Sequence, residues 1–183
     1  MNSFRVCFAV LGCAALTGCA APQPTASTAE PSTVWYSGTV AVSSADGATP
    51  YGPPKQALVA RTVDKAHNLI VEVVVDDGVL RTTTLQREGD SNVFSATDND
   101  KTFSGKVMMT GEGWNISGWT YDLAMADGSG RIAGTATVDA SGIQTEKHFV
   151  TPDGRKKVRI ADTLTPISKA EYDAKLAGLL GKP

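Results

Sequence analysis

Cysteine is almost absent from this chain. The sequence has three cysteines, at positions 7, 13 and 19, and none in the remaining residues. The chain beyond Cys19 therefore offers no pair of thiols for a disulfide and no cysteine-ligated metal site. A domain built from it must be stabilised by packing alone.

An excess of positive charge is also missing. Lys and Arg number 17 against 19 Asp and Glu, which gives a formal net charge of −2 at pH 7. This balance lacks the basic footprint of a nucleic-acid-binding protein, so we predict no nucleic-acid partner. One local basic cluster, Arg155, Lys156, Lys157 and Arg159, could contact anionic lipid head groups or form the solvated face of a hairpin.

The usual sequence signatures of catalysis are missing too. His67 and His148 lie far apart, without His-x-His or His-Glu-x-x-His spacing. No Gly-x-Ser-x-Gly motif and no Gly-rich phosphate loop occurs. We therefore predict no catalytic residue, no metal site and no cofactor. Glu146 and His148 share one face of a predicted strand, where we expect His148 to be a hydrogen-bonded or solvent-facing histidine. An acid–base pair or a single-histidine haem ligand is the alternative.

The apolar run at residues 6–16 is too short to span a bilayer. It holds about eleven residues, whereas a spanning helix needs roughly 20. Arg5 precedes the run, and the small residues Thr17 and Gly18 follow it. This order is typical of a signal peptide, which we assign to residues 1–18.

The sequence Leu16-Thr17-Gly18-Cys19 resembles the lipobox of bacterial lipoproteins. The resemblance implies cleavage before Cys19, a diacylglycerol on its thiol and an acyl chain such as palmitate on the new amino terminus. Two acyl signals anchor a protein firmly to a membrane. The resemblance therefore implies that the protein binds a membrane through its N-terminal lipid and is located in the bacterial cell envelope. Ala20 in place of Asp implies the outer membrane, facing the periplasm, in a Gram-negative host. An ordinary secretory signal with a coincidental cysteine is the alternative.

The remainder of the chain divides into a tether and one domain. Residues 19–32 contain the lipidated cysteine and an Ala/Pro/Thr/Ser-rich stretch without hydrophobic periodicity, which is typical of a flexible tether. Residues 33–183 suit a single domain.

The domain is predicted to be all-β. Short runs of β-branched and aromatic residues are separated by Asp-Gly or other Gly-containing turns at a spacing of roughly ten residues. The expected strands cover 33–43, 56–64, 67–76, 79–88, 91–98, 101–109, 113–125, 129–139, 142–151 and 155–165.

Tight turns make neighbouring strands antiparallel, so these strands form an up-and-down meander. Such a sheet leaves two bare edges unless it closes into a barrel, and a half-open sheet is the alternative. After the last strand the spacing of apolar residues changes to the helical one, which predicts one short helix at about residues 168–180. Ser168 and Glu171 form a predicted capping box, and Ile167 and Tyr172 a hydrophobic staple.

The meander resembles the calycin-like barrels, the superfamily of lipocalins and fatty-acid-binding proteins. Val34-Trp35-Tyr36-Ser37-Gly38 is similar to the Gly-x-Trp opening of lipocalins, although position 33 is Thr. The resemblance implies a cavity for an apolar or amphipathic small molecule. Large side chains that would line it, or simply fill the core, are Trp35, Phe103, Trp114, Trp119 and Tyr121, with Met108 and Met109.

Three functions are compatible with these patterns. The first is an envelope lipoprotein that binds or carries a hydrophobic or amphipathic small molecule in its barrel. The second is a structural lipoprotein whose filled barrel is a scaffold for an envelope protein partner. The third, an enzyme acting on an envelope substrate, has no catalytic motif in its favour.

Overall fold

Ten strands joined mainly by short turns occupy most of the chain from Ser32 onward in the computed structural model, which describes residues 30–76 and 78–180. The assigned signal peptide, Cys19 and most of the assigned tether lie outside the described residues. The strands are β1 (Ser32–Ser44), β2 (Lys55–Asp64), β3 (Leu69–Asp76), β4 (Val79–Arg87), β5 (Val93–Asp98), β6 (Phe103–Glu112), β7 (Asn115–Met125), β8 (Arg131–Asp139), β9 (Gly142–Val150) and β10 (Lys156–Ile167).

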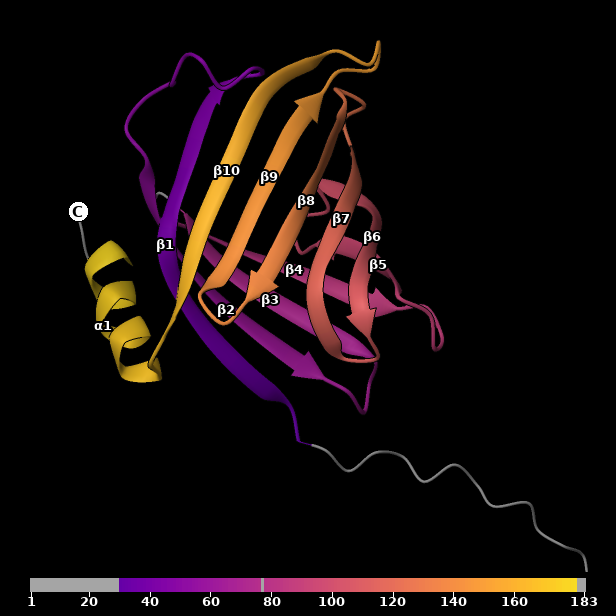
Figure 1. The fold of residues 1–183 in the computed structure, drawn as a ribbon, viewed down its shortest axis with the longest axis vertical. Coiled ribbons are helices and arrows are strands. Elements are labelled where there is room, and N and C mark those ends of the chain that lie inside the picture. Colours follow the sequence, from indigo (N-terminus) through magenta and orange to yellow (C-terminus); the bar gives the residue numbers. More distant parts are fainter. Residues whose placement is uncertain (1–29, 77, 181–183) are drawn as a thin grey trace, which may run out of the picture.

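The sheet closes into a barrel. Each strand pairs antiparallel with the next one in the sequence, and β1 pairs with β10 to complete the ring (Figure 1). The closing pair runs from Trp35 opposite Ile167 to Ser44 opposite Val158. The predicted all-β meander is confirmed, and it is closed rather than half-open. No strand lacks a neighbour, so the described part of the chain is a self-contained folding unit.

Glycine shapes the turns that the sequence marks. Gly128 in the β7–β8 turn has φ 73° and Gly154 in the β9–β10 turn has φ 84°. These are left-handed conformations that cost other residues energy because of their Cβ atom. The preceding aspartates, Asp127 and Asp153, each accept a backbone hydrogen bond from two residues further on.

The two ends of the barrel differ. One end, which we call the plugged end, carries the β2–β3, β4–β5, β6–β7 and β8–β9 turns. Buried apolar side chains fill it, among them Tyr36, Ile70, Phe94 and Met109. The opposite end, which we call the mouth end, carries the β1–β2 loop and the β3–β4, β5–β6, β7–β8 and β9–β10 turns.

The helix α1 (Lys169–Leu180) packs on the outside of the barrel beside β1 (Figure 1). Its predicted capping box is confirmed: the Glu171 backbone N–H donates to Ser168 Oγ, and the Ser168 backbone N–H donates to Glu171 Oε2. Tyr172 is buried against Leu58 and Val75 of the outer wall, whereas Leu180 is exposed. No helix in the described residues is long and apolar enough to cross a membrane.

Alternation on β3 shows which face is inside. Glu72, Val74 and Asp76 line the interior, so Val71 and Val73 point outward. The more apolar face of this strand is therefore the outer one. Its last member, Val75, is fully buried beneath α1, which explains part of that outward apolar character.

Candidate ligand cavity

A cavity of about 260 Å³ lies inside the barrel and extends toward the mouth end. Its lining runs from mouth-end positions such as Ala57 of β2 and Ile132 of β8 to deeper positions such as Leu85 of β4, Ile143 of β9 and Leu164 of β10. None of the four plug residues named above lines it. Arg81, beside the β3–β4 turn, lines the cavity and is exposed. The cavity therefore opens toward the mouth end and is blind at the other.

Three of the aromatic residues predicted to line the barrel do so. Phe103 of β6 and Trp119 and Tyr121 of β7 form part of the cavity wall. Trp119 and Tyr121 contact each other edge to face, with ring centroids 6.0 Å apart. The rest of the wall is mainly aliphatic. It includes Val40, Ala57, Val59, Val74, Leu85, Ala96, Val107, Leu123, Ile132, Ile143, Ile160 and Leu164.

Two predicted lining residues lie elsewhere, and this corrects the sequence-based assignment. Trp35 points outward from β1 and packs against the cluster of Leu58, Val75 and Tyr172 beneath α1. Its neighbour Tyr36 takes the inward position instead, because side chains alternate along a strand. Trp114 lies next to β7 and packs edge to face on Phe94, a plug residue, with centroids 5.9 Å apart.

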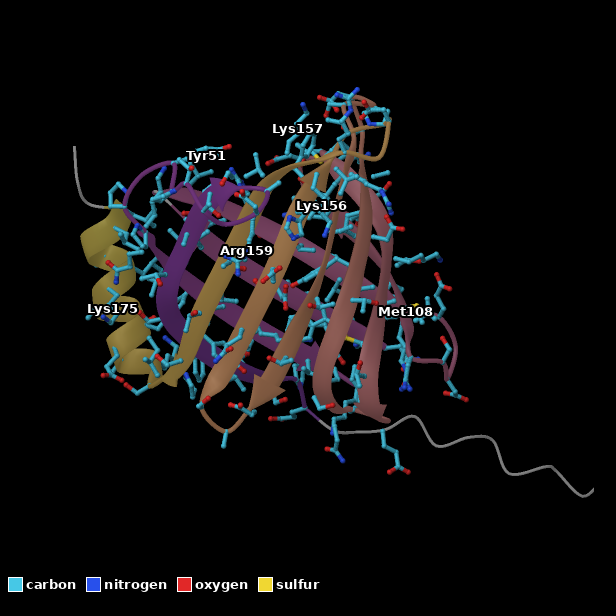
Figure 2. The ribbon with its side chains drawn as sticks, turned by 45° about the horizontal axis from the view of Figure 1, so that its top comes forward. Tyr51, Met108, Lys156, Lys157, Arg159 and Lys175 are labelled. Carbon is cyan, nitrogen blue, oxygen red and sulfur yellow. The ribbon has the colours of Figure 1, made fainter. Side chains whose placement is uncertain are left out.

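The two methionines separate in the same way. Met109 is buried in the core cluster, whereas Met108 is 59% exposed on the outer wall of the barrel (Figure 2).

Charged side chains also point into the barrel, which sequence reasoning did not assign. Arg61 of β2 is buried, and its Nε lies 3.5 Å from Glu72 Oε1 of β3. Its guanidinium lies over the Trp119 ring, 4.3 Å from the centroid. A buried arginine needs such partners because an isolated charge in an apolar core is strongly unfavourable.

A second ion pair lies on β9 and β10. Lys147 Nζ donates to Asp162 Oδ2 at 2.6 Å, and Thr145 Oγ1 donates to the same oxygen at 2.7 Å. Lys147 Nζ also lies 6.0 Å from the centroid of Tyr121. The intervening residue of β8 is Gly134, which has no side chain to separate them.

Tyr121 is close enough to both pairs to respond to their charges. Burial raises the pKa of its phenol, and the negative charges of Glu72 and Asp162 raise that pKa further. A hydrogen bond with Trp119 and the positive charge of Arg61 oppose this rise. The hydroxyl therefore keeps its proton and can donate. We call these six side chains the polar belt: Arg61, Glu72, Tyr121, Thr145, Lys147 and Asp162.

Three buried polar atoms at the cavity have no hydrogen-bond partner among the described residues. They are Asp76 Oδ1 and Asp162 Oδ1, which are acceptors, and Arg61 Nη2, which is a donor. Asp76 and Asp162 both line the cavity, and Arg61 lies behind the wall that Glu72 and Trp119 form. Buried polar atoms are nearly always satisfied in folded proteins, so these three atoms lack the hydrogen-bond partners that such atoms normally have.

Glu146 and His148 lie outside the barrel. They flank the inward-pointing Lys147 on β9 and therefore project from the opposite face. His148 Nε2 lies 3.4 Å from Glu146 Oε1, and Arg159 donates to Glu146 Oε2 at 2.7 Å. The hydrogen bond from Arg159 lowers the pKa of Glu146. Within the described residues no three His, Cys, Asp or Glu side chains are grouped as metal ligands.

The basic cluster lies around the β9–β10 hairpin at the mouth end, where Lys156, Lys157 and Arg159 are labelled in Figure 2. Two of its members are paired with carboxylates. Arg155 Nε lies 2.7 Å from Asp153 Oδ2, and Arg159 binds Glu146. Lys156 and Lys157 are exposed.

No family model, curated protein or solved structure matches this chain.

Proposed function

We propose that this protein is a lipid-anchored protein of the bacterial cell envelope that binds a small hydrophobic or amphipathic molecule inside its barrel. The single observation that carries the binding proposal is the blind cavity of about 260 Å³, apolar over most of its wall and polar at one belt. Ligand sites commonly have this composition. The volume of this cavity lies just below the smallest volumes typical of such sites, about 300 Å³, which suits a small ligand. The anchor part of the proposal rests on Leu16-Thr17-Gly18-Cys19.

The unpaired belt atoms support a binding role over a purely structural interior. A barrel that evolved only as a filled scaffold has no need of buried charges, because well-packed apolar side chains stabilise a core at least as well. Here two ion pairs border the empty space instead.

A scaffold for an envelope protein is the second candidate, and one observation favours it. Large apolar residues remain exposed at or next to the mouth end, namely Val79 and Leu80 of β4, Tyr51 of the β1–β2 loop and Leu180 of α1. Exposed apolar residues that gather in one region are typical of interaction surfaces.

Native mass spectrometry of residues 30–183, purified gently from a bacterial host, tests the binding proposal. We expect an additional mass of a few hundred daltons that is lost on denaturation. Val74→Phe should abolish it, because Val74 lines the cavity and the larger ring would fill the space. Val73→Phe is the matched control, since the same change on the outer face of β3 leaves the cavity intact. A clean mass with no uptake from an envelope lipid extract would refute binding and favour the scaffold.

A further inference from the structure

The charges at the cavity balance. Lys147 and Arg81 on the wall, together with Arg61 behind it, are opposed by the carboxylates of Glu72, Asp162 and Asp76. Four of the six are already joined in the two ion pairs, and Asp76 and Arg81 lie nearer the mouth. The interior therefore presents hydrogen-bonding atoms without a surplus of either charge.

The unpaired atoms define what a ligand must supply. Asp162 Oδ2 accepts from Lys147 and Thr145, whereas Oδ1 of the same carboxylate is buried and accepts nothing from the described residues. Asp76 Oδ1 is in the same situation. Each of these oxygens needs a donor, and leaving it without one costs free energy.

From this arrangement we infer that the cavity takes an uncharged amphiphile whose polar end donates hydrogen bonds, such as an alcohol. The inference deepens the binding function proposed above and rests on it. A hydroxyl can donate to Asp162 Oδ1 and can accept from a donor such as the Tyr121 hydroxyl, which stays protonated.

A charged polar end fits this belt poorly. A carboxylate would lie near Glu72 and Asp162. The Lys147 ammonium is already bound by Asp162, and Arg61, whose Nη2 has no partner, lies behind the wall that Glu72 and Trp119 form. An ammonium could reach Asp162 Oδ1 but would add a third positive charge beside Arg61 and Lys147. Either ion would also lose its hydration in a cavity whose wall is mainly apolar, and the balanced belt offers nothing to compensate.

Three ligands of the same chain length distinguish an uncharged, an anionic and a cationic polar end. Binding of 1-octanol, octanoate and octylamine to residues 30–183 is measured by isothermal titration calorimetry at neutral pH. We expect 1-octanol to bind at least about tenfold more tightly than either ion. Octanoate or octylamine binding as tightly as 1-octanol would overturn the inference and leave the binding function standing. No binding of any of the three would count against the binding function itself.

Changing the balance of charge should change the preference in a set direction. Asp162→Asn leaves the Lys147 ammonium without its carboxylate, so we expect octanoate to gain at least about tenfold in affinity relative to octylamine. Lys147→Met leaves Asp162 without its cation and should shift the preference toward octylamine. Asp122→Asn is the control, because Asp122 is exposed and pairs with Arg131 away from the cavity.

Circular dichroism shows whether Asp162→Asn and Lys147→Met fold, and either variant alone suffices for the test if the other folds poorly. If either folded variant retains the wild-type order of affinities, the belt does not select the polar end of the ligand and the inference fails.

Discussion

Replacing Arg61 by methionine should destabilise the barrel strongly. The Arg61 and Glu72 side chains are only 8% and 18% exposed. Methionine keeps the aliphatic volume but leaves the Glu72 carboxylate buried without a counter-charge. Breaking a buried pair in this way costs about 3–5 kcal/mol. The stacking on Trp119 is lost as well, which contributes roughly a further 1–2 kcal/mol when it is desolvated.

The assay is urea unfolding of residues 30–183 followed by tryptophan fluorescence and circular dichroism. The free energy of unfolding from urea should fall by about 4–7 kcal/mol. In thermal unfolding this corresponds to a melting temperature lower by roughly 10–25 °C for a domain of about this length. The double variant Arg61→Met with Glu72→Met should recover most of the loss, because two apolar side chains replace both charges.

The control for this prediction is Arg131→Met. Arg131 pairs with Asp122 at 3.0 Å, and both side chains are about half exposed. Exposed pairs contribute less than about 1 kcal/mol, so this variant should be nearly neutral. If Arg61→Met costs no more than Arg131→Met, or if the double variant is less stable than the single one, the proposed role of the buried pair is wrong.

Three further predictions concern the anchor, the wall and acid stability. Cys19→Ala should abolish acylation and leave uncleaved or released protein; a cleaved, acylated form in the membrane fraction would refute the lipobox. Gly118→Val should cost about 1–3 kcal/mol in urea unfolding, because a Cβ there would lie 2.5 Å from the Ala136 carbonyl oxygen; Thr120→Val, exposed on the same strand, should not. Although burial opposes it, hydrogen bonds from Thr102 and the Phe103 N–H lower the pKa of Asp98. Its stabilising effect is therefore present above about pH 4 and lost below, so Asp98→Asn should flatten the fall in unfolding free energy on acidification.

The fold was accessible from the sequence because its signals are local. Turn residues such as Gly128 and Gly154 separate the strands, and tight turns leave only an antiparallel meander. The capping box at Ser168 could be predicted for the same reason, since it involves residues only three apart.

The lining of the cavity was only partly accessible because it depends on the phase of each strand. Where a helix covers the outside of the barrel wall, an aromatic side chain can be buried on either face of that wall. Residue type alone therefore could not show that Trp35 points outward and Trp119 inward. The charged belt was missed for a related reason. On β3 the more apolar face is the outer one, so hydrophobic alternation would place Glu72 in solvent. On β9 both faces carry polar residues, and only the closed register shows that Glu72 and Lys147 point inward.

The pairing of β1 with β10 governs how the barrel can assemble. Every other neighbouring pair is consecutive in the chain, so those hairpins can form one after another. The seam from Trp35 to Ile167 is different, since it joins residues from opposite ends of the domain and must wait for the last strand. Until then β1 and β9 present bare edges that invite aggregation. A chain that stops short of Lys156 would therefore have no enclosed interior at all. In the full domain the cavity arises only when the last strand closes the barrel.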